Sequence, residues 1–393
     1  MKIELVMMSS LNKSGGGRET WLLNYLEELQ ARECADTYDF SVLQLAENSL
    51  LDDFGCGGGG LVGAIRQYGK LFSVFPTPIR FAVSYLTRGM CLSIKEPLAY
   101  DVVIAVGGLN EAIPVAFSSF LFRGRSRSKK IIWLRTIYTK EKGYRFGPFA
   151  RRMLLKLECF LYKRFFNLVV ANGDDTAAFY RQAGLDVSVV HNSTNLSRWL
   201  SVDGSESERF RIAFIGRLSS VKGISEFLSS IRRMQEINVD EFANVEFHVV
   251  GDGDVKSKEA VLDLQDKGLL KYHGAMDNRS LPNFLEDIDC CVALTLLNDD
   301  IGGGGVSNAL IEQMAAGKAI IAWDNSIFTP ILSPEVAWMV PQGSVGGLTS
   351  AYIDACSDRA QVFRKGRLCR ERSLDFDIRA HVNRFYNLIN KGA

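Results

Sequence analysis

IAFIGRLSSVKGISEF, residues 212–227, has the pattern of a buried strand, a tight loop and a helix. The apolar run 212–215 ends at Gly216, and an amphipathic pattern begins near Gly223. Open α/β sheets bind ligands just beyond the carboxyl ends of their strands, where free N–H groups of a following helix favour an anion. Arg217 and Lys222 stand at that place in the sequence. We therefore expect them to bind a diphosphate.

The same alternation of strand and helix patterns extends along the chain. Short, nearly all-apolar runs are typical of strands buried on both faces of a parallel sheet. They occur at 3–8, 102–106, 131–134, 168–171, 212–215, 247–250, 291–296 and 319–323. Helical patterns occur at 19–31, 149–166, 176–183, 224–236 and 307–316. We predict an α/β protein with parallel sheets, divided at the polar stretch 200–209 into domains 1–200 and 201–374.

Composition narrows the classes of function. The 393 residues are 47% hydrophobic and 23% charged, with a net charge of +1, so nothing attracts the chain as a whole to nucleic acid. Residues 1–200 nevertheless carry a net charge of +7 and the rest −6. Eight cysteines without a CxxC pair indicate reduced thiols and a cytoplasmic protein. We expect no metal, no cofactor, no signal peptide and no membrane-spanning helix.

Two further glycine-rich turns follow predicted strands. Gly15, Gly16 and Gly17 precede an amphipathic helix in the first half, which repeats the anion-site pattern. In VVGDGD, Gly251 and Gly253 form a turn that lets a ligand approach the backbone closely. By contrast, GCGGGGLVG at 55–63 satisfies G-x-G-x-x-G but lies too far from a strand, and we interpret it as a flexible loop.

The stretch DDIGGGGVSNALIEQM, residues 299–314, combines four glycines with a helix that holds one carboxylate. Ser307 is a suitable N-cap, and Gly317 follows the helix as its terminator. Asn308 and Glu312 share a face away from the buried one. Glu312 is therefore placed to accept two ribose hydroxyls, while glycine N–H groups bind charge.

Taken together, these motifs resemble the retaining glycosyltransferases of family 4, which have the GT-B architecture. The resemblance is carried by GGGRETWL, HNSTNL, GRLSSVKG, VVGDGD, YHGAMDNRSL and GVSNALIEQMAAGKAIIAWD. It implies two Rossmann-like domains facing a central cleft, with the C-terminal helix, within 375–393, crossing back to the first domain. It also implies metal-independent transfer of a hexose or related sugar from a nucleotide sugar.

The resemblance assigns roles to individual residues. Arg217 and Lys222 hold the diphosphate, Glu312 binds the ribose and the backbone near Met276 contacts the base. The implied donor-binding set is Gly15, Gly16, Gly17, Gly216, Arg217, Lys222, Gly251, Gly253, Met276, Asp300, Gly304, Gly305, Val306, Ser307, Asn308 and Glu312, of which Arg217, Lys222 and Glu312 are the catalytic residues.

Two positions depart from the family pattern. The family places another glutamate eight residues before the ribose glutamate, and Gly304 stands there instead. Asp300 or Asp299 could replace the lost contact with the transferred sugar. Many relatives have a histidine after the strand that matches 131–134, where this chain has Arg135, which we assign to the acceptor side.

The acceptor is expected in the first domain, where residues 61–95, 123–130 and 149–166 mix apolar and basic side chains. Such a surface suits an anionic membrane, so we expect peripheral attachment to the inner membrane face. A glycan or lipid-linked acceptor of polysaccharide or lipopolysaccharide biosynthesis would follow. Two alternatives remain open at this point: a nucleotide-sugar-binding subunit without catalysis, and a nucleotide-sugar epimerase of the same architecture.

Overall fold

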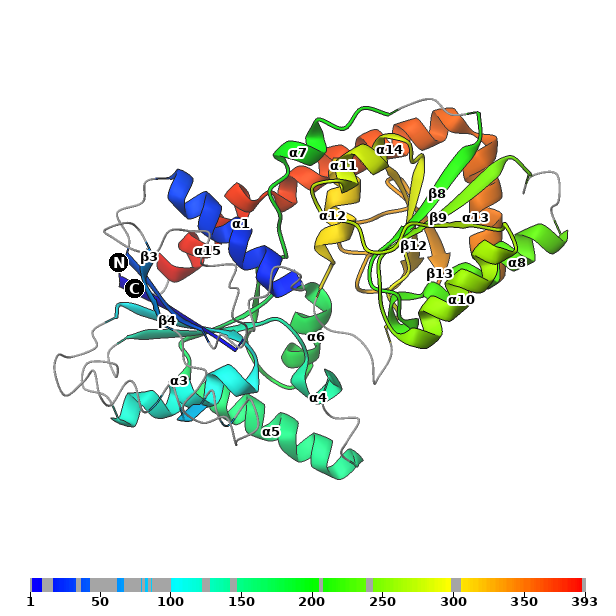
Figure 1. Cartoon of the computed structure of the whole chain (residues 1–393). Helices are drawn as coiled ribbons and strands as arrows, with labels where there is room; N and C mark the ends of the chain where they lie inside the picture. Colours follow the sequence, from blue (N-terminus) through cyan, green and yellow to red (C-terminus); the bar gives the residue numbers. More distant parts are fainter. Residues whose placement is uncertain are drawn as a thin grey trace. The chain divides into compact units, whose positions relative to one another are not determined.

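The computed structural model describes residues 2–8, 17–32, 37–42, 62–66, 79, 82–83, 86, 100–121, 128–141, 147–204, 208–237, 243–297 and 305–390. The chain forms two compact units, each built around its own sheet (Figure 1). Unit 1 comprises Met1–Asn192, Gly302–Gly305 and Ile378–Ala393. Unit 2 comprises Ser193–Ile301 and Val306–Asp377, so the chain passes between the units before the predicted boundary at residue 200.

Unit 1 contains a seven-stranded sheet in the order β3-β2-β1-β4-β5-β6-β7, with every described pair of neighbours parallel. Its strands are β1 (Lys2–Met7), β2 (Thr37–Val42), β3 (Val62–Arg66), β4 (Val102–Gly107), β5 (Lys129–Leu134), β6 (Leu168–Ala171) and β7 (Ser188–Val189). Its helices are α1 (Gly17–Ala31), α3 (Leu109–Leu121), α4 (Tyr138–Glu141), α5 (Pro148–Phe165), α6 (Asp174–Gln182) and α15 (Ile378–Asn390).

Alternate residues of the central strands of unit 1 face two separate apolar cores. Ile3 and Leu5 of β1 pack into the core that α1 and α15 cover, whereas Val6 packs into the core beneath α3, α5 and α6. Figure 1 shows these helices on the two sides of the sheet. Burial on both faces explains why the strands read as continuous apolar runs rather than alternating ones.

Unit 2 contains a six-stranded parallel sheet in the order β10-β9-β8-β11-β12-β13. Its strands are β8 (Phe210–Ile215), β9 (Val245–Val250), β10 (Lys271–Tyr272), β11 (Cys290–Ala293), β12 (Ala319–Asp324) and β13 (Trp338–Pro341). Its helices are α7 (Ser197–Leu200), η4 (Ser220–Lys222), α8 (Ile224–Ile237), α10 (Val255–Asp266), α11 (Leu281–Glu286), α12 (Asn308–Ala315), α13 (Val345–Ser357), α14 (Arg359–Ser373) and η5 (Leu374–Phe376).

The two parallel-sheet α/β units confirm the predicted fold class. In both sheets the first strand lies beside the fourth, which is the doubly wound order with a switch point between these two strands. In unit 2 the switch point lies between β8 and β11. This position is where the chemistry of the domain is expected, because the chain leaves these two strands in opposite directions and opens a crevice.

Some sequence-based boundaries were wrong. The strand expected at 291–296 ends at Ala293, because Leu296 N–H bonds the carbonyl of Val221 instead of a neighbouring strand. The loop expected at 55–63 ends earlier than predicted, since Val62–Arg66 forms β3 and pairs with β2. The remainder of that loop, residues 55–61, lies outside the described residues.

Candidate functional site: the switch point of unit 2

Two cations lie at the carboxyl ends of β8 and β11. Arg217 follows Gly216 directly after β8 and is exposed. Lys222 closes the single turn η4 just before α8, and its Nζ donates to Oγ1 of Thr295 at 3.4 Å, in the segment that follows β11. A backbone bond of 2.9 Å from Leu296 N–H to Val221 O holds the two loops together. The switch point therefore presents two cations beside the N-terminus of α8.

Burial affects the charge of one of these cations. The pKa of Lys222 is lowered from its ordinary value, first because its ammonium group is desolvated and second because the positive charge of Arg217 lies nearby. Two like charges held close together are unfavourable unless an anion neutralises them. The arrangement is therefore poised to bind an anion, and the nearby helix N-terminus acts in the same direction.

The loops after β8, β9 and β10 are bonded to one another. Gly251 N–H donates to the carbonyl of Gly274 at 2.8 Å, and Leu218 N–H donates to the carbonyl of Asp252 at 3.0 Å. A Cβ at Gly251 would lie 1.9 Å from Gly216 O, and a Cβ at Gly253 would lie 1.8 Å from a backbone oxygen of the same neighbouring loop. Only glycine allows this close approach. The glycines predicted to contact a ligand thus also hold two loops together.

Glu312 is buried on α12, with only 5% of its surface exposed. The hydroxyl of Thr194 donates to its Oε1 at 3.2 Å, and the amide of Asn278 donates to the same carboxylate. Burial raises the pKa of Glu312, while Arg198 and the two donors oppose this shift. Glu312 is therefore not a solvated surface residue. Glu312 is instead an oriented carboxylate within unit 2.

Two amide atoms near this carboxylate have no internal partner. Asn278 Oδ1 and Asn308 Nδ2 are buried, and neither makes a hydrogen bond within the described part of the chain. A buried polar atom without a partner is costly, and a bound polar ligand removes that cost. Ser307 caps α12 as predicted, with its Oγ accepting from Leu310 N–H. The mouth of α12 thus combines a capped helix with unused hydrogen-bonding capacity.

The remaining predicted donor-site residues fall into two groups. Gly305 adopts a left-handed conformation with φ of 64°, Val306 is buried beside it, and Met276 is partly buried in the loop after β10. Gly17 begins α1 in unit 1. The others lie outside the described residues: Gly15, Gly16, Asp299, Asp300 and Gly304.

The corresponding switch point of unit 1 is occupied by a side chain of the protein itself. The carboxylate of Glu111 accepts from Gly108 N–H at 2.9 Å and from Met8 N–H at 3.2 Å, at the ends of β4 and β1. These are the backbone donors that an anionic ligand would use. Glu111 therefore takes the place of an anion in unit 1, whereas unit 2 presents cations at the equivalent position.

Arg135 lies within an aromatic cluster of unit 1. It is 8% exposed, and its guanidinium lies 5.0 Å from the ring centre of Trp21 and 5.7 Å from that of Trp133. His381 of α15 stacks on Trp133, with 5.2 Å between ring centres. This packing gives Arg135 a structural environment, and contact with an acceptor stays a prediction.

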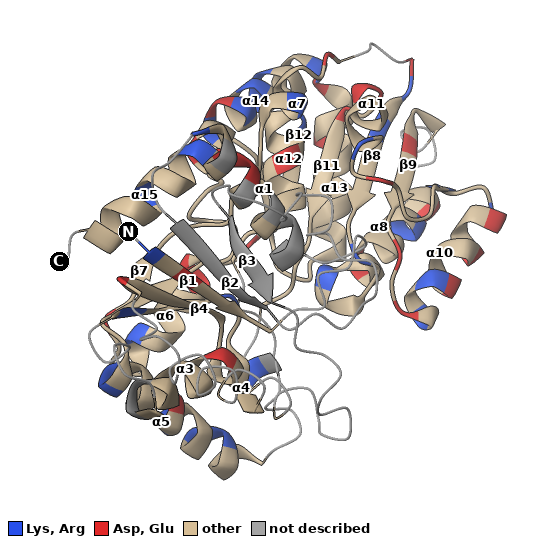
Figure 2. Cartoon of the chain, turned by 60° about the vertical axis from the view of Figure 1, so that its left-hand side comes forward, with Lys and Arg blue, Asp and Glu red and all other residues tan. Residues whose placement is uncertain are grey.

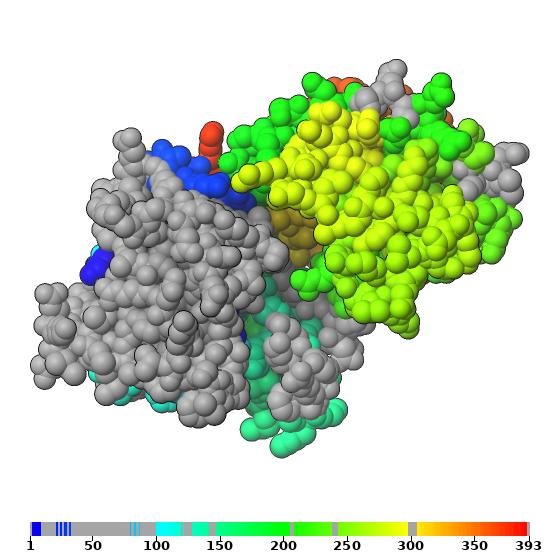
Figure 3. Space-filling view, viewed as in Figure 1, coloured from blue at the N-terminus to red at the C-terminus, as the bar shows by residue number. Residues whose placement is uncertain are grey.

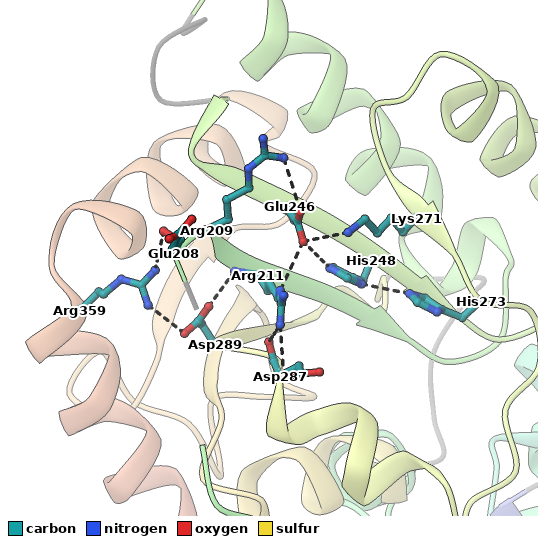
Figure 4. Close-up of polar contacts among 10 residues, drawn as sticks. All are labelled: Glu208, Arg209, Arg211, Glu246, His248, Lys271, His273, Asp287, Asp289 and Arg359. Atoms are coloured by element: carbon teal, nitrogen blue, oxygen red, sulfur yellow. Dashed lines mark hydrogen bonds and ion pairs between the residues drawn. The ribbon is translucent and has the colours of Figure 1, made fainter. Parts of the chain in front are cut away.

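A polar network begins at Glu246, near the amino end of β9, and runs along the strand to His248 and on to His273 just after β10 (Figure 4). Glu246 accepts from Arg211 at 3.3 Å and from Lys271 at 3.1 Å. His248 Nδ1 and His273 Nε2 share a hydrogen bond of 3.0 Å, and burial lowers the pKa of His248 to about 4. We interpret this network as structural.

Sequence reasoning did not identify the residues that orient the predicted ones. Thr194, Arg198 and Asn278 contact or face Glu312, and Thr295 bonds Lys222. Thr194 and Asn278 lie within HNSTNL and YHGAMDNRSL, the motifs that carried the resemblance. Their position in those motifs was the available signal, but only the fold shows that they meet α12. In the space-filling view, the segment from α10 to α11 forms much of the visible surface of unit 2 (Figure 3).

Two doubly wound units in one chain, with cations at the switch point of the second, define the class of GT-B glycosyltransferase folds. Residues 209–358 match the family model described as "Glycosyl transferases group 1". The matched segment contains the switch-point residues Arg217 and Lys222 together with Glu312, so this part of unit 2 is similar in sequence to the group 1 glycosyltransferases. The resemblance inferred from the sequence motifs is confirmed.

Comparison with individual proteins agrees with this assignment. The chain is 26% identical over 218 residues to a phosphatidyl-myo-inositol mannosyltransferase of Mycolicibacterium smegmatis, covering 53% of each chain. It is 23% identical to the amylovoran biosynthesis glycosyltransferase AmsK of Erwinia amylovora, covering 39% of this chain and 37% of that one. The structure of HepE from Anabaena, in complex with UDP-glucose, superimposes over 100% of both chains with a TM-score of 0.70 and 17% identity.

These comparisons differ in how much of the protein they cover and in what they show about it. The chain spans about half the length, or less, of the curated relatives it matches. At 17% identity, the likeness to HepE shows the fold alone. Among the helices within the described ranges, none is both long and apolar enough to cross a membrane.

Proposed function

We propose that this protein transfers a hexose or related sugar from a nucleoside-diphosphate donor to a glycan or lipid-linked acceptor, with retention of the anomeric configuration and without a metal. The observation that carries the proposal is the pair Arg217 and Lys222 at the switch point of unit 2, with Lys222 fixed by Thr295. The match of residues 209–358 to the glycosyltransferase family model supports the reaction class. The UDP-glucose complex of HepE and the mannosyltransferase relative support a nucleotide sugar as donor.

The chemistry follows from where charge develops. When the bond between the anomeric carbon and the diphosphate oxygen breaks, the electron pair and a negative charge go to the leaving diphosphate. Cations fixed beforehand stabilise that charge more in the transition state than in the ground state. Arg217 can bond two phosphate oxygens at once, and Lys222 acts as a point charge. With both in place, a divalent metal is unnecessary for neutralisation.

Glu312 supplies the second anchor of the proposed donor site. An ionised carboxylate accepts strong hydrogen bonds from two vicinal hydroxyls such as those of a ribose. Thr194 and Asn278 fix its orientation, and the unused atoms Asn278 Oδ1 and Asn308 Nδ2 are free to bond the same nucleotide. Displacing the ribose would leave these polar groups buried and unpaired, so they favour a nucleotide over a simple phosphate.

A lipid-linked or polysaccharide acceptor is part of the same proposal. The printed names of two relatives refer to phosphatidyl-myo-inositol and to amylovoran biosynthesis, a lipid and a polysaccharide context. The basic excess of the first 200 residues favours an anionic surface near the acceptor. We therefore propose cytoplasmic action at the inner membrane face.

A donor screen tests the proposal. The full chain is titrated with a panel of nucleotide sugars, and thermal shift and slow donor hydrolysis are measured, with the anomer of the released sugar assigned by NMR. Lys222→Met and Glu312→Gln should each weaken donor binding about 10- to 100-fold, the value of one charge-assisted hydrogen bond. Arg359→Gln removes a cation from the opposite edge of the same sheet and serves as the matched control, with unchanged affinity.

The outcomes separate the alternatives. Hydrolysis with retention supports the transferase. Donor binding without turnover, even with membrane extract as the acceptor source, supports a subunit without catalysis, an alternative raised by Gly304. Conversion of the donor to its epimer supports an epimerase, although each of the four histidines has a partner away from the switch point of unit 2. Equal affinity of Lys222→Met, Glu312→Gln and wild type would refute the site.

A further inference from the structure

Helix α5 of unit 1 carries an apolar stripe that faces solvent. Phe149 is 78% exposed, Phe160 60%, Met153 50% and Leu157 47%. At about 3.6 residues a turn, these four positions fall on one side of the helix. The opposite side is anchored in the core through residues such as Tyr162. Four large exposed apolar side chains on one helix exceed the scattered single residues that are normal on a surface.

The charges of α5 share the exposed side with this stripe. Arg152, Lys156, Lys163 and Arg164 are exposed. The single acidic residue of the helix, Glu158, is fully buried beneath it. The solvent-facing side of α5 therefore offers apolar side chains and positive charge without a compensating acid.

The neighbouring helix extends the apolar surface. Helix α3 packs beside α5 on the same side of the sheet (Figure 1). Its residues Phe117 and Leu121, one turn apart, are 52% and 49% exposed. Figure 2 shows the Lys and Arg residues of α5 in blue along this outer side of unit 1.

We propose that the exposed stripe of α5, with Phe117 and Leu121 of α3, docks unit 1 on an anionic lipid bilayer. A helix with aromatic and aliphatic residues beside Lys and Arg lies in the membrane interface, with the apolar side among acyl chains and the cations at the phosphates. Charge complementarity selects this occupant. A second copy would bring like charges face to face, because the exposed charges beside the stripe are all cationic, and that contact is unfavourable.

The surface contains none of the residues proposed to bind the donor, and Arg217, Lys222 and Glu312 all belong to unit 2. The inference rests on the proposed function in one respect: docking on the membrane would serve to bring a lipid-linked acceptor to the enzyme. Binding to lipid needs no donor and no turnover. The docking surface and the transferase can therefore fail independently.

Vesicle flotation tests the inference with the full-length protein. Vesicles of phosphatidylglycerol in phosphatidylcholine are compared with pure phosphatidylcholine at low and high salt. Wild type should float with the anionic vesicles at low salt and be released at high salt. Replacing Arg152, Lys156 and Lys163 by Gln should lower the affinity about a hundredfold, at about fivefold for each cation near an anionic surface.

The apolar contribution has its own variant. Phe149→Ser with Phe160→Ser should lower the affinity at least about tenfold and leave less salt-resistant binding. Unit 2 offers matched controls on exposed positions: Phe363→Ser for the aromatic change, and Gln at Lys256, Arg364 and Arg367 for the charges. The controls should bind vesicles as wild type does.

Three results would overturn the inference: no flotation of wild type at low salt, equal loss in the controls, or a dimer in sedimentation velocity that the Phe149→Ser, Phe160→Ser variant dissociates. Thermal melting and the donor thermal shift of each variant establish that it is folded. Vesicle binding by a protein without donor turnover would sustain this inference and remove the proposed function. Turnover without vesicle binding would sustain the proposed function and refute this inference.

Discussion

Mild acid should loosen α15 from unit 1, because His381 is held in its neutral form. The indole N–H of Trp21 donates to His381 Nε2 at 3.0 Å, and His381 Nδ1 bonds the carbonyl of His191 at 2.9 Å. Indole is a donor only, so Nε2 must accept and Nδ1 must carry the proton. Protonating Nε2 would set two N–H groups against each other. Burial lowers the pKa of His381 to about 3, and the positive charge of Arg135 acts in the same direction.

The sign and size of the effect follow from linkage. The pKa of His381 is about 3 in the folded protein against 6.5 for the ordinary side chain. The unfolded chain therefore binds more protons between these values, and stability is lost as pH falls from 6.5 toward 3. Each pH unit in that window costs about 1.4 kcal/mol. Acidification from pH 7.5 to 5 should remove about 2 kcal/mol from the free energy of unfolding through this residue alone.

Urea unfolding of wild type and His381→Gln at both pH values measures this quantity. The glutamine keeps an acceptor for Trp21 and does not titrate, so the pH dependence of all other groups cancels in the comparison. Wild type should lose about 2 kcal/mol more than the variant between pH 7.5 and 5. Hydrogen exchange in α15 should show the same difference locally. A difference below about 0.5 kcal/mol would refute the conclusion that the fold holds His381 in its neutral form.

Three further predictions follow from single residues. Glu158 should give the opposite pH dependence, because burial raises its pKa from 4.5 to about 7. Wild type should therefore lose about 3 kcal/mol of stability relative to Glu158→Gln as pH rises from 4.5 to 7.5. Urea unfolding would show this loss, and a difference in stability that stays constant with pH would contradict it. Gly253→Ala places a Cβ 1.8 Å from a backbone oxygen and should cost about 1–3 kcal/mol in urea unfolding, whereas Gly147→Ala, with open space around it, should cost far less. Thr194→Val removes a hydrogen bond to Glu312 and should weaken the affinity for the nucleotide sugar about threefold to tenfold, with a larger loss at lower pH. Titration with the nucleotide sugar at several pH values measures this, and an affinity equal to that of wild type at every pH would contradict the role of Thr194.

The sequence was sufficient for the fold where local pattern and burial agree. Strands such as 168–171 are buried on both faces, so their apolar runs stand out from the amphipathic helices between them. β13 escaped prediction because WMVP is short, partly exposed and ends in proline. The end of β11 was misplaced because Leu294–Leu297 is apolar except for Thr295 after the ladder stops, and hydrogen bonds to distant loops decide where it stops.

The candidate site, like the fold, could be predicted from the sequence only in part. Arg217 and Lys222 could be placed beside each other because both lie in one strand–loop–helix motif. The environment of Glu312 could not be predicted, since Thr194 and Asn278 are remote in sequence and reach it only through the packing of α12 against the neighbouring segments. Helical periodicity placed Glu312 away from the apolar face, and polar neighbours nevertheless bury it.

The return of α15 to unit 1 has a consequence for how the protein is made. Ile378, Val382, Phe385 and Ile389 belong to the same core as the first strand of the chain. A ribosome that has finished the first half has therefore not yet supplied the residues that close that core. Unit 1 has to wait, with the core beneath α1 only partly closed, until α15 is translated, whereas every segment of unit 2 has by then been synthesised. The second unit in sequence is thus the first that can complete its fold.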